Sequence, residues 1–387
     1  MNALDLVYSG AALAAAPWLA FKAATDARYR DRLAERLGAL PPGPPGLWFH
    51  GASVGEVNLV RPLAKRLGRP FRVTALTRAG REQAAKLTPL ASYFPLDFTF
   101  AVDRAMRAAR PVGIVLVELE VWPNFLSRAR VPVVVVNGRI TDRSFRRYRR
   151  LDGFFRRAFG SIAAVGARDA ESADRFGALG VREIAVTGNL KYDSGLAPDP
   201  KAGSEWRARL GWTGPILVGG STHEPEERIL LDAYRELRRE VPELRLAIAP
   251  RHVERAEEVK RLAGSDAFVL DTVGQLVGLY SAATVVFIGG TFCARGGQNM
   301  LEPAALGKPV VGGSSLSNFE EIAGSLAEAG GMIVVPEPAG LAEALRRALR
   351  EAGPMGARAR EVAEKGRGAM DRTEALVRQC VGGFPRR

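Results

Sequence analysis

The chain has 387 residues, which is enough for two domains that each bury a core of their own. With 47% hydrophobic and 25% charged residues, the composition is that of a globular protein and excludes extensive disorder. Two cysteines and three histidines, none at a metal-ligand spacing, argue against a disulfide framework and a tightly held metal. The net charge of +13 indicates an anionic partner, and nucleic acid, an acidic membrane and a phosphorylated substrate all satisfy it.

The N-terminal region, 1–40, contains sixteen uncharged residues from Leu6 to Phe21. As a helix they would extend ~24 Å, short of the ~30 Å hydrocarbon core of a bilayer. The cations that follow are Lys22, Arg28, Arg30, Arg32 and Arg36. An apolar helix with a basic flank is typical of a shallow anchor on the cytoplasmic side of a membrane. A buried or surface helix is the alternative, and both interpretations stay open.

Beyond residue 41, apolar runs typical of strands alternate with helical patterns. VGIVLVELE at 112–120 and VPVVVVNG at 131–138 are apolar almost throughout, as strands of a parallel sheet with two covered faces are. The other expected strands are 47–50, 71–77, 162–167, 182–189, 215–220, 244–250, 285–290, 309–313 and 331–336. Helices are expected at 57–67, 80–87, 226–240 and 341–350.

This alternation predicts an α/β protein with two doubly wound, Rossmann-like domains facing across a cleft. We expect an N-terminal domain at 41–193 and a C-terminal domain at 194–355, joined through the stretch SGLAPDPKAGSE at 194–205. In the remaining 356–387, a closing helix at roughly 356–380 can return to the first domain. Ligands of open α/β sheets bind beyond the carboxyl ends of the strands, so candidate residues should follow strands directly.

HGASVGEV at 50–57 leads from a strand through a glycine-rich turn into a helix. Gly51 and Gly55 would let the backbone approach a ligand closely, and the amides that follow can receive an anion. Glu56 would lie in the first helical turn, on the floor of the cleft, as a candidate catalytic group. The alternative is that Glu56 only complements the helix dipole.

VELEVWPN at 117–124 ends a strand with two carboxylates, Glu118 and Glu120. Side chains at i and i+2 of a strand share a face, so the two charges would be neighbours and would raise each other's pKa. Such a shift is useful for proton transfer and costly otherwise. A solvated strand end, with Trp122 as packing, is the alternative.

Three further segments offer groups for an anion. Lys191, in TGNLKYD, can meet a phosphate or a carboxylate, or simply be solvated. Ser221 and Thr222, in GGSTHEPEE, can bind phosphate, or they can cap the next helix together with a glutamate at 226 or 227. Arg251, in APRHVER, offers a fork of donors suited to either anion.

GGTFCARGGQNMLEPAALGKPVVGG at 289–313 is the most specific segment. Its glycine-rich loops flank a helix that should begin near Asn299, with Glu302 in the first turn. A carboxylate at that place can hold ribose hydroxyls, as in other nucleotide-binding folds. The segment has neither the GxGxxG nor the GxxxxGK[ST] spacing, so it indicates neither a nicotinamide site nor a P-loop.

Between Arg139 and Arg157 the chain carries eight arginines and two aspartates, mixed with aromatic residues. This composition predicts a surface that binds an anionic membrane, to which each basic residue contributes ~1 kcal/mol. A solvated face of an arginine-rich protein is the alternative. The arginines expected on the membrane surface are Arg143, Arg146, Arg147, Arg149 and Arg150.

In order along the chain, HGASVGEV, VELEVWPN, NGRITDRS, TGNLKYD, STHEPEE, PRHVER and GGQNMLEPAALGKPV resemble the 3-deoxy-D-manno-octulosonic acid (Kdo) transferases. The resemblance runs from the N-terminal apolar segment to about residue 350. It implies a GT-B fold and transfer of Kdo from CMP-Kdo to a lipid A precursor, with no cofactor besides the donor substrate and no nucleic acid as partner. It also implies a place at the cytoplasmic face of the inner membrane, peripheral or with a short N-terminal anchor.

The resemblance implies roles for single residues as well. Glu56 would be the general base, and Glu118 and Lys191 would stabilise the transition state. The residues that would contact the CMP part of the donor are Pro250, Arg251, Gly274, Gln275, Leu276, Asn299, Met300, Leu301 and Glu302. The chain departs from the family's GGHNPLEP pattern at Gln298 and Met300, where the family has histidine and proline.

Two other functions fit the residues. A GT-B enzyme that uses another nucleotide sugar, such as a UDP-hexose, would have the same two-domain architecture. A basic nucleic-acid-binding protein would have the same charge, although the sequence contains no helix-turn-helix, zinc module or RNP-like aromatic pattern.

Overall fold

The computed structural model describes residues 2–25, 31–194 and 201–382, which form two compact units. Unit 1 contains the chain up to Leu190 and again from Gly368 on, and unit 2 contains Lys191 to Arg367. The chain thus enters unit 2 slightly before the expected boundary at 193. Arg28 and Arg30 of the expected basic flank, and positions 195–200 of the expected linker, lie outside the described residues.

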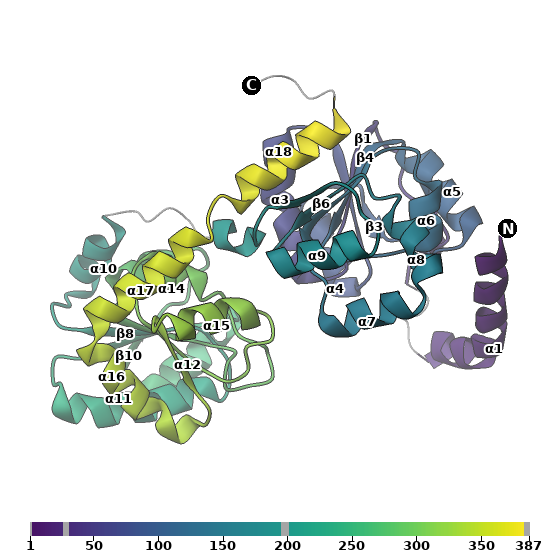
Figure 1. Cartoon of the computed structure of the whole chain (residues 1–387). Coiled ribbons are helices and arrows are strands. Elements are labelled where there is room, and N and C mark those ends of the chain that lie inside the picture. Colours follow the sequence, from purple (N-terminus) through teal and green to yellow (C-terminus); the bar gives the residue numbers. More distant parts are fainter. Residues whose placement is uncertain (1, 26–30, 195–200, 383–387) are drawn as a thin grey trace. The chain divides into compact units, whose positions relative to one another are not determined.

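Unit 1 is built on a seven-stranded parallel sheet with the strand order β3-β2-β1-β4-β5-β6-β7. Figure 1 draws this sheet with β1, β3, β4 and β6 labelled. The order reverses between β1 and β4, which is the switch point of a doubly wound sheet. The strands are β1 (Gly46–His50), β2 (Phe71–Ala75), β3 (Ala91–Tyr93), β4 (Pro111–Val117), β5 (Val133–Gly138), β6 (Ala164–Ala167) and β7 (Ile184–Val186). The sequence reading did not anticipate β3, because three residues are too few to give a recognisable apolar run.

Helices cover both faces of this sheet, as its almost wholly apolar central strands require. Phe125, Phe159 and Phe176 belong to the hydrophobic cluster on one face, and Leu63 and Val377 to the cluster on the other. The helices on the first face are α5 (Thr99–Ala109), α6 (Pro123–Arg128), α7 (Asp142–Arg150), α8 (Asp152–Phe159) and α9 (Ala170–Ala178). Those on the second face are α3 (Val54–Leu67), α4 (Arg78–Ala85) and α18 (Ala369–Val381).

The N-terminal segment forms helix α1 (Ala3–Thr25), followed after a gap by the short α2 (Leu33–Arg36). Polar contacts hold the start of α1 against the rest of unit 1. Asp5 accepts a hydrogen bond from the backbone amide of Thr99 at 2.9 Å, and the hydroxyl of Tyr8 donates to Asp97 at 3.1 Å. Among the described residues, no helix combines the length and the apolar character that crossing a membrane requires.

The closing helix expected at 356–380 is two helices, α17 (Ala352–Lys365) in unit 2 and α18 in unit 1. The break falls at a glycine pair: Gly368 adopts φ 85°, a left-handed conformation that glycine tolerates best. α18 then lies along α3, where the Arg378 guanidinium donates to the carbonyl oxygen of Arg66 at 2.8 Å. Gly368 therefore lets the chain turn from α17 into α18, whose residues complete the core of unit 1.

Unit 2 has a six-stranded parallel sheet with the order β10-β9-β8-β11-β12-β13, and its switch point lies between β8 and β11. The strands are β8 (Ile216–Thr222), β9 (Arg245–Pro250), β10 (Ala267–Val269), β11 (Val285–Ile288), β12 (Val310–Gly313) and β13 (Met332–Val335). The remaining helices are α10 (Ala202–Leu210), α11 (Glu226–Glu240), α12 (Ala256–Ala263), α13 (Leu276–Ala282), α14 (Leu301–Ala305), α15 (Glu320–Glu328) and α16 (Leu341–Arg350). Short 3-10 turns occupy Leu190–Ser194, Val253–Arg255 and Pro338–Gly340.

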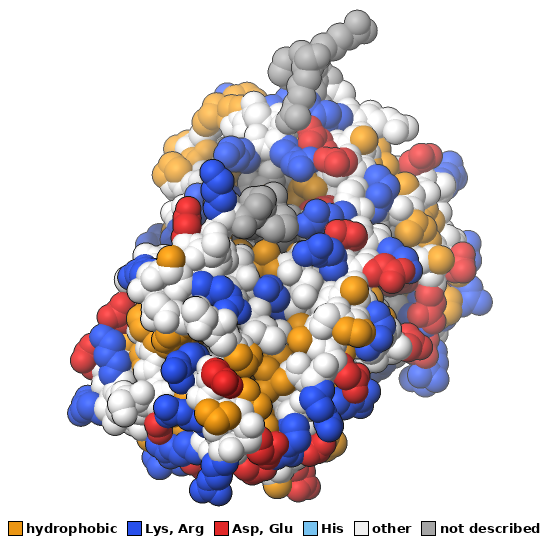
Figure 2. Space-filling model, turned by 90° about the vertical axis from the view of Figure 1, so that its left-hand side faces the viewer, with side chains coloured by type: hydrophobic (Ala, Val, Ile, Leu, Met, Phe, Trp, Pro, Cys, Tyr) orange, Lys and Arg blue, Asp and Glu red, His pale blue; other side chains and the backbone are white. Residues whose placement is uncertain are grey.

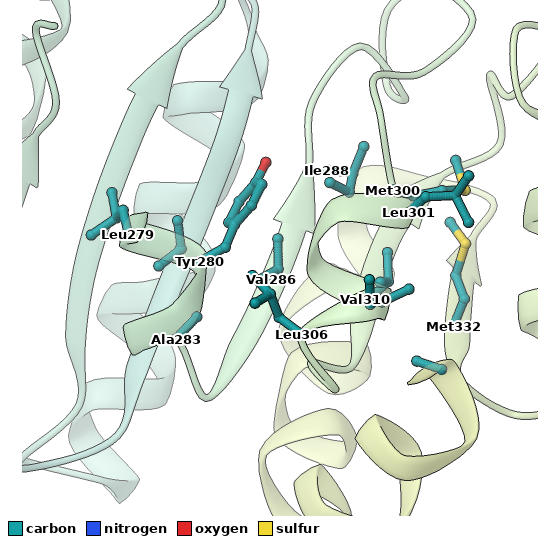
Figure 3. Close-up of a cluster of buried hydrophobic side chains, with 14 of the residues drawn as sticks. Leu279, Tyr280, Ala283, Val286, Ile288, Met300, Leu301, Leu306, Val310 and Met332 are labelled. Atoms are coloured by element: carbon teal, nitrogen blue, oxygen red, sulfur yellow. The ribbon is translucent and has the colours of Figure 1, made fainter. Parts of the chain in front are cut away.

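One hydrophobic cluster of unit 2 joins α13 and α14 to the central strands (Figure 3). The Tyr280 ring of α13 is 1% exposed and stands beside β8. A Cβ atom at Gly220 would lie 1.8 Å from the Tyr280 hydroxyl oxygen, so only glycine leaves room for this ring. The same close packing fixes the end of β8, from which the candidate residues of unit 2 follow.

Candidate active site

The first two motifs predicted to carry chemistry meet at the switch point of unit 1. HGASVGEV follows β1 and VELEVWPN follows β4, and the two strands pair directly, with His50 opposite Leu116. The carboxyl ends of adjacent parallel strands open at the same edge of the sheet. Residues that are more than 60 positions apart in the sequence are therefore brought together, and each motif directly follows a strand, as predicted.

Glu56 folds back over the turn that precedes α3. Its carboxylate accepts from the amide of Ala52 at 2.7 Å and from the hydroxyl of Ser53 at 2.9 Å, while Ser53 caps the helix by accepting from the amide of Glu56. The Ser-x-x-Glu spacing is that of a capping box, but the carboxylate reaches the amide of Ala52, one residue before the cap, instead of the amide of Ser53. Burial raises the pKa of Glu56, and the charge of Glu118 raises it further.

The glycines of this turn differ in their use. A Cβ atom at Gly51 would lie 3.0 Å from the Cβ atom of Glu56, so Gly51 makes room for the folded-back glutamate rather than for a ligand. A Cβ atom at Gly55 would meet only the Ser53 hydroxyl oxygen, at 3.8 Å. Close backbone approach to a ligand is therefore open at Gly55, while Gly51 serves the packing of Glu56.

Glu118 does not lie on a strand, contrary to the prediction from the sequence. β4 ends at Val117, and Glu118 adopts φ 64°, a conformation that turns the chain away from the extended path. The expectation that Glu118 and Glu120 share a strand face is therefore wrong. The charge of Glu118 nevertheless raises the pKa of Glu120, and it also raises the pKa of Glu56. The charge of Glu56 in turn raises the pKa of Glu120.

Glu120 has a strongly raised pKa. Burial raises its pKa to about 7, with further contributions from the charges of Glu56 and Glu118, while a hydrogen bond from the indole of Trp122 at 2.8 Å opposes the rise. Trp122 is thus a partner of the carboxylate and not merely packing. The sequence predicts Glu120 only as a neighbour of Glu118 and indicates no role of its own for it.

The candidate residues of unit 2 also gather at a switch point. GGST ends β8, GGTFC follows β11, and Gly220 lies opposite Ile288 in the paired strands. The Thr222 hydroxyl is buried and donates to Glu227 at 3.0 Å, whereas Ser221 adopts φ 55°. The alternative in which Ser221 or Thr222 caps α11 is wrong, because Pro225 is its N-cap and makes no side-chain cap bond.

Cationic groups surround the loops beyond β8 and β9. Pro250 ends β9 and is buried, and the exposed Arg251 follows it, with its amide donating to the carbonyl oxygen of Thr222 at 2.9 Å. Burial lowers the pKa of His223, and the charges of Arg295 and Arg251 add to this effect. The sequence reading missed His223 and Arg295, because a histidine after a strand and an arginine in a glycine-rich loop carry no distinctive spacing.

The Gly274–Leu276 turn opens α13. Gly274 adopts φ 87°, and Gln275 is the N-cap residue of the helix. The Gln275 side-chain oxygen accepts from the Arg209 guanidinium at 3.2 Å, and Leu276 packs against the core cluster of unit 2. The turn therefore leaves mainly backbone groups for a ligand.

Asn299 and Glu302 form a pair at the start of α14. The Asn299 side-chain amide donates to Glu302 at 3.0 Å and its oxygen accepts from the amide of Leu301 at 3.1 Å. Glu302 lies in the first turn, as predicted, and burial raises its pKa. Met300 and Leu301 point into the core (Figure 3), so only their backbone is open to a nucleotide.

Lys191 belongs to unit 2, whereas Glu56 and Glu118 belong to unit 1. Its ammonium group donates to the carbonyl oxygen of Asn318 at 2.8 Å and lies 5.0 Å from the centre of the Phe319 ring. Lys191, in the 3-10 turn Leu190–Ser194, therefore contacts the loop between β12 and α15. Its predicted role in the transition state stays a prediction.

The five arginines of the predicted membrane surface all lie exposed on α7. Of the neighbouring aromatic residues, Tyr148 and Phe159 are buried, while Phe154 is 47% exposed beside an exposed Leu151. Figure 2 shows one face of the molecule, on which Lys and Arg side chains are spread among Asp and Glu. Basic residues are thus general on this chain, and what distinguishes α7 is their density within one helix.

The described residues contain no group of three or more His, Cys, Asp or Glu side chains that could hold a metal ion. The three carboxylates of unit 1 can instead accept or hold protons. The unit 2 loops offer arginines, backbone amides and the carboxyl group of Glu302, which is paired with Asn299. The arginines and amides suit a phosphate, and the carboxyl group suits a sugar hydroxyl.

Comparisons with known proteins identify the family. The model of the family described as 3-deoxy-D-manno-octulosonic-acid transferase (kdotransferase) matches residues 31–194. A 3-deoxy-D-manno-octulosonic acid transferase of Haemophilus influenzae is 31% identical, over 91% of this chain and 92% of its own length. The chain belongs to the Kdo transferase family. Another Kdo transferase, from Chlamydophila psittaci, is 33% identical over 81% of each chain, and the chain is accordingly an enzyme of the glycosyltransferase class.

Solved structures confirm the fold expected of a Kdo transferase. A UDP-GlcNAc 2-epimerase from Neisseria meningitidis matches with a TM-score of 0.54 at 14% identity, over 86% of this chain and 100% of its own. A glycosyltransferase from Rickettsia africae matches with a TM-score of 0.53 at 11% identity, over 88% and 100%. At these identities the likeness establishes the GT-B fold alone.

The two departures from the family pattern have different surroundings in this Kdo transferase. Gln298 places its side-chain nitrogen 3.2 Å from Nε2 of His223, so it keeps a polar contact at this position. Met300 is fully buried in the core, where an apolar side chain of another shape can replace proline.

Proposed function

We propose that this Kdo transferase moves Kdo from CMP-Kdo onto a lipid A precursor, with inversion at the anomeric carbon and with Glu56 as the general base. One observation carries the proposal: Glu56, at the switch point of unit 1, has a raised pKa and lies within reach of the charges of Glu118 and Glu120. A carboxyl group whose pKa moves toward neutrality is a better proton acceptor than an ordinary one. The names of the relatives support Kdo as the sugar.

In the proposed step, an acceptor hydroxyl oxygen attacks the anomeric carbon of Kdo, and its proton passes to a carboxylate oxygen of Glu56. The bond between the anomeric carbon and the phosphate oxygen breaks, and CMP leaves with the electron pair. A single displacement of this kind inverts the configuration. A positioned base typically contributes ~10²–10⁴-fold to the rate of such a step.

The other candidate residues would act on charge. Arg251 and Lys191 would offset the negative charge that collects on the departing phosphate, and Glu118 would stabilise positive charge that develops on the sugar. Glu302, held by Asn299, would accept hydrogen bonds from ribose hydroxyls. The acceptor lipid would be presented at an anionic membrane surface, to which the arginines of α7 bind.

A product assay tests the proposal directly. The full chain is incubated with CMP-Kdo and a tetraacylated lipid A precursor, and the lipid is analysed by mass spectrometry. Addition of Kdo with release of one CMP per transfer is expected. In parallel, CMP and UDP are compared for their effect on the melting temperature. Stabilisation by UDP and not by CMP, together with no Kdo product, would instead support a transferase of another nucleotide sugar.

A further inference from the structure

The first turn of α11 carries two glutamates that bond to loops outside their own helix. Glu226 is fully buried and Glu227 is 1% exposed. A buried carboxylate is costly unless hydrogen bonds satisfy its oxygens, so the partners of these residues indicate how the fold uses them.

Glu226 accepts four backbone hydrogen bonds. One carboxylate oxygen accepts from the amides of His223 at 2.9 Å and Gly290 at 2.7 Å. The other accepts from the amides of Thr291 at 2.8 Å and Phe292 at 2.9 Å. Three of the four donors are consecutive residues of the glycine-rich loop that follows β11. A glutamate that served only its own helix would bond to amides of the first turn.

The loop held by Glu226 closes directly onto the Asn299–Glu302 segment. The amide of Gly297 donates to the carbonyl oxygen of Gly290 at 2.8 Å, and the amide of Gln298 donates to that of Gly289 at 3.1 Å. The conformation of the loop at its start therefore fixes where the chain re-enters at Asn299.

Glu227 makes a different connection. One of its oxygens accepts from the Thr222 hydroxyl at 3.0 Å and from the Arg255 guanidinium at 2.9 Å. It thereby joins the end of β8 to the loop after β9. Both of its donors can be satisfied by a single carbonyl-type oxygen, whereas the four donors around Glu226 need two accepting oxygens.

We propose that Glu226 is a positioning residue for the donor, which holds the 289–298 loop in the conformation that presents Asn299 and Glu302 to the nucleotide. This inference rests on the proposed function, because it takes the nucleotide to be CMP bound at that segment. Glu226 itself is buried behind the loop and acts through it. A loop fixed before the ligand arrives lowers the ordering cost of binding.

The test is direct binding of CMP to the full-length chain by calorimetry, combined with steady-state kinetics. In Glu226→Gln, the side-chain amide faces two backbone donors that it cannot accept from, so the loop loses part of its anchor. We expect the Kd for CMP to rise about tenfold or more, with a parallel rise in KM for CMP-Kdo and a smaller change in kcat. Glu227→Gln keeps an accepting oxygen for both of its donors and should change the Kd far less.

Two further variants keep the inference falsifiable. Glu226→Asp retains the carboxylate with a shorter reach, and it should weaken CMP binding even where Glu226→Gln folds poorly. Glu236→Gln, an exposed change on the same helix, should bind CMP as the wild type does. If the wild type binds CMP and every folded Glu226 variant binds it equally well, this inference is overturned. If the wild type itself does not bind CMP, the proposed function fails first.

Discussion

A carboxylate oxygen of Glu120 lies 4.0 Å from Nε2 of His50, a ring nitrogen that has no hydrogen-bond partner among the described residues. His50 is fully buried, and burial lowers its pKa to about 3, so the ring is neutral. Its Nδ1 lies 3.0 Å from the carbonyl oxygen and 3.1 Å from the hydroxyl oxygen of Thr74, and the tautomer that donates to this carbonyl leaves Nε2 without a proton. His50 therefore cannot offset the charge of Glu120, and the pKa of that carboxyl stays near 7.

The first prediction follows from this raised pKa. Between the ordinary value of 4.5 and about 7, the folded chain keeps a proton on Glu120 that the unfolded chain has released, so stability falls as pH rises through this range. Glu120→Gln removes the loss, and the variant should be more stable than the wild type at pH 8 by on the order of 2 kcal/mol. The difference should vanish near pH 4.

Urea denaturation of both proteins across this pH range measures the effect. Burial raises the pKa of Asp97 to about 6, and Asp97 contributes a slope of the same sign, so the variant's profile should flatten without becoming level. Two profiles that run parallel from pH 4 to pH 8 would show that Glu120 titrates normally.

A second prediction concerns the packing of β8 against α13. Gly220→Ala would drive a methyl group into the Tyr280 ring and should destabilise the chain by about 1–3 kcal/mol or more. The matched control is Gly353→Ala, because a Cβ atom at that helical glycine meets nothing within 4 Å, and this change should be neutral or slightly stabilising. Thermal unfolding of the two variants compares them. Equal melting temperatures would mean that the Tyr280 ring moves freely aside.

A third prediction concerns the membrane. Replacing Arg143, Arg146, Arg147 and Arg150 of α7 by serine should weaken sedimentation with anionic vesicles, with a loss of ~1 kcal/mol for each arginine at the surface. The control variant removes the same charge from α11, at Arg228, Arg235, Arg238 and Arg239. Vesicle binding that falls equally in both variants would indicate a response to net charge. Vesicle binding that is unchanged in the α7 variant would contradict a membrane-binding role for these arginines.

The sequence predicted the doubly wound architecture well, because buried parallel strands and amphipathic helices have strong local signals. The helices at 226–240 and 341–350 have the predicted bounds. The short edge strands β3 and β10 were not predicted, since three residues give no clear period. The break between α17 and α18 was not predicted either. It depends on the left-handed conformation of Gly368, where the chain passes from unit 2 back to unit 1.

The sequence predicted that the candidate residues follow strands directly, and it predicted their contacts less well. Motifs after β1 and β4, and after β8 and β11, follow from the rule that ligands bind at the carboxyl ends of strands. What Glu226 bonds to could not be read from the sequence, because its partners at 290–292 are brought near only by sheet order. The neutral state of His50 likewise depends on burial, which no local pattern reports.

The most direct test of the central claim is the turnover of Glu56→Gln with CMP-Kdo and the lipid A precursor. The glutamine side-chain oxygen can still accept from the amide of Ala52, and its NH2 group can donate to the Ser53 hydroxyl oxygen, so the helix start should stay capped and the variant should fold. With Glu56 as the base, kcat should fall ~10²–10⁴-fold while CMP binding is retained. The exposed change Glu82→Gln in the same unit should leave kcat as it is. A folded Glu56→Gln enzyme that keeps most of its turnover would contradict the assignment.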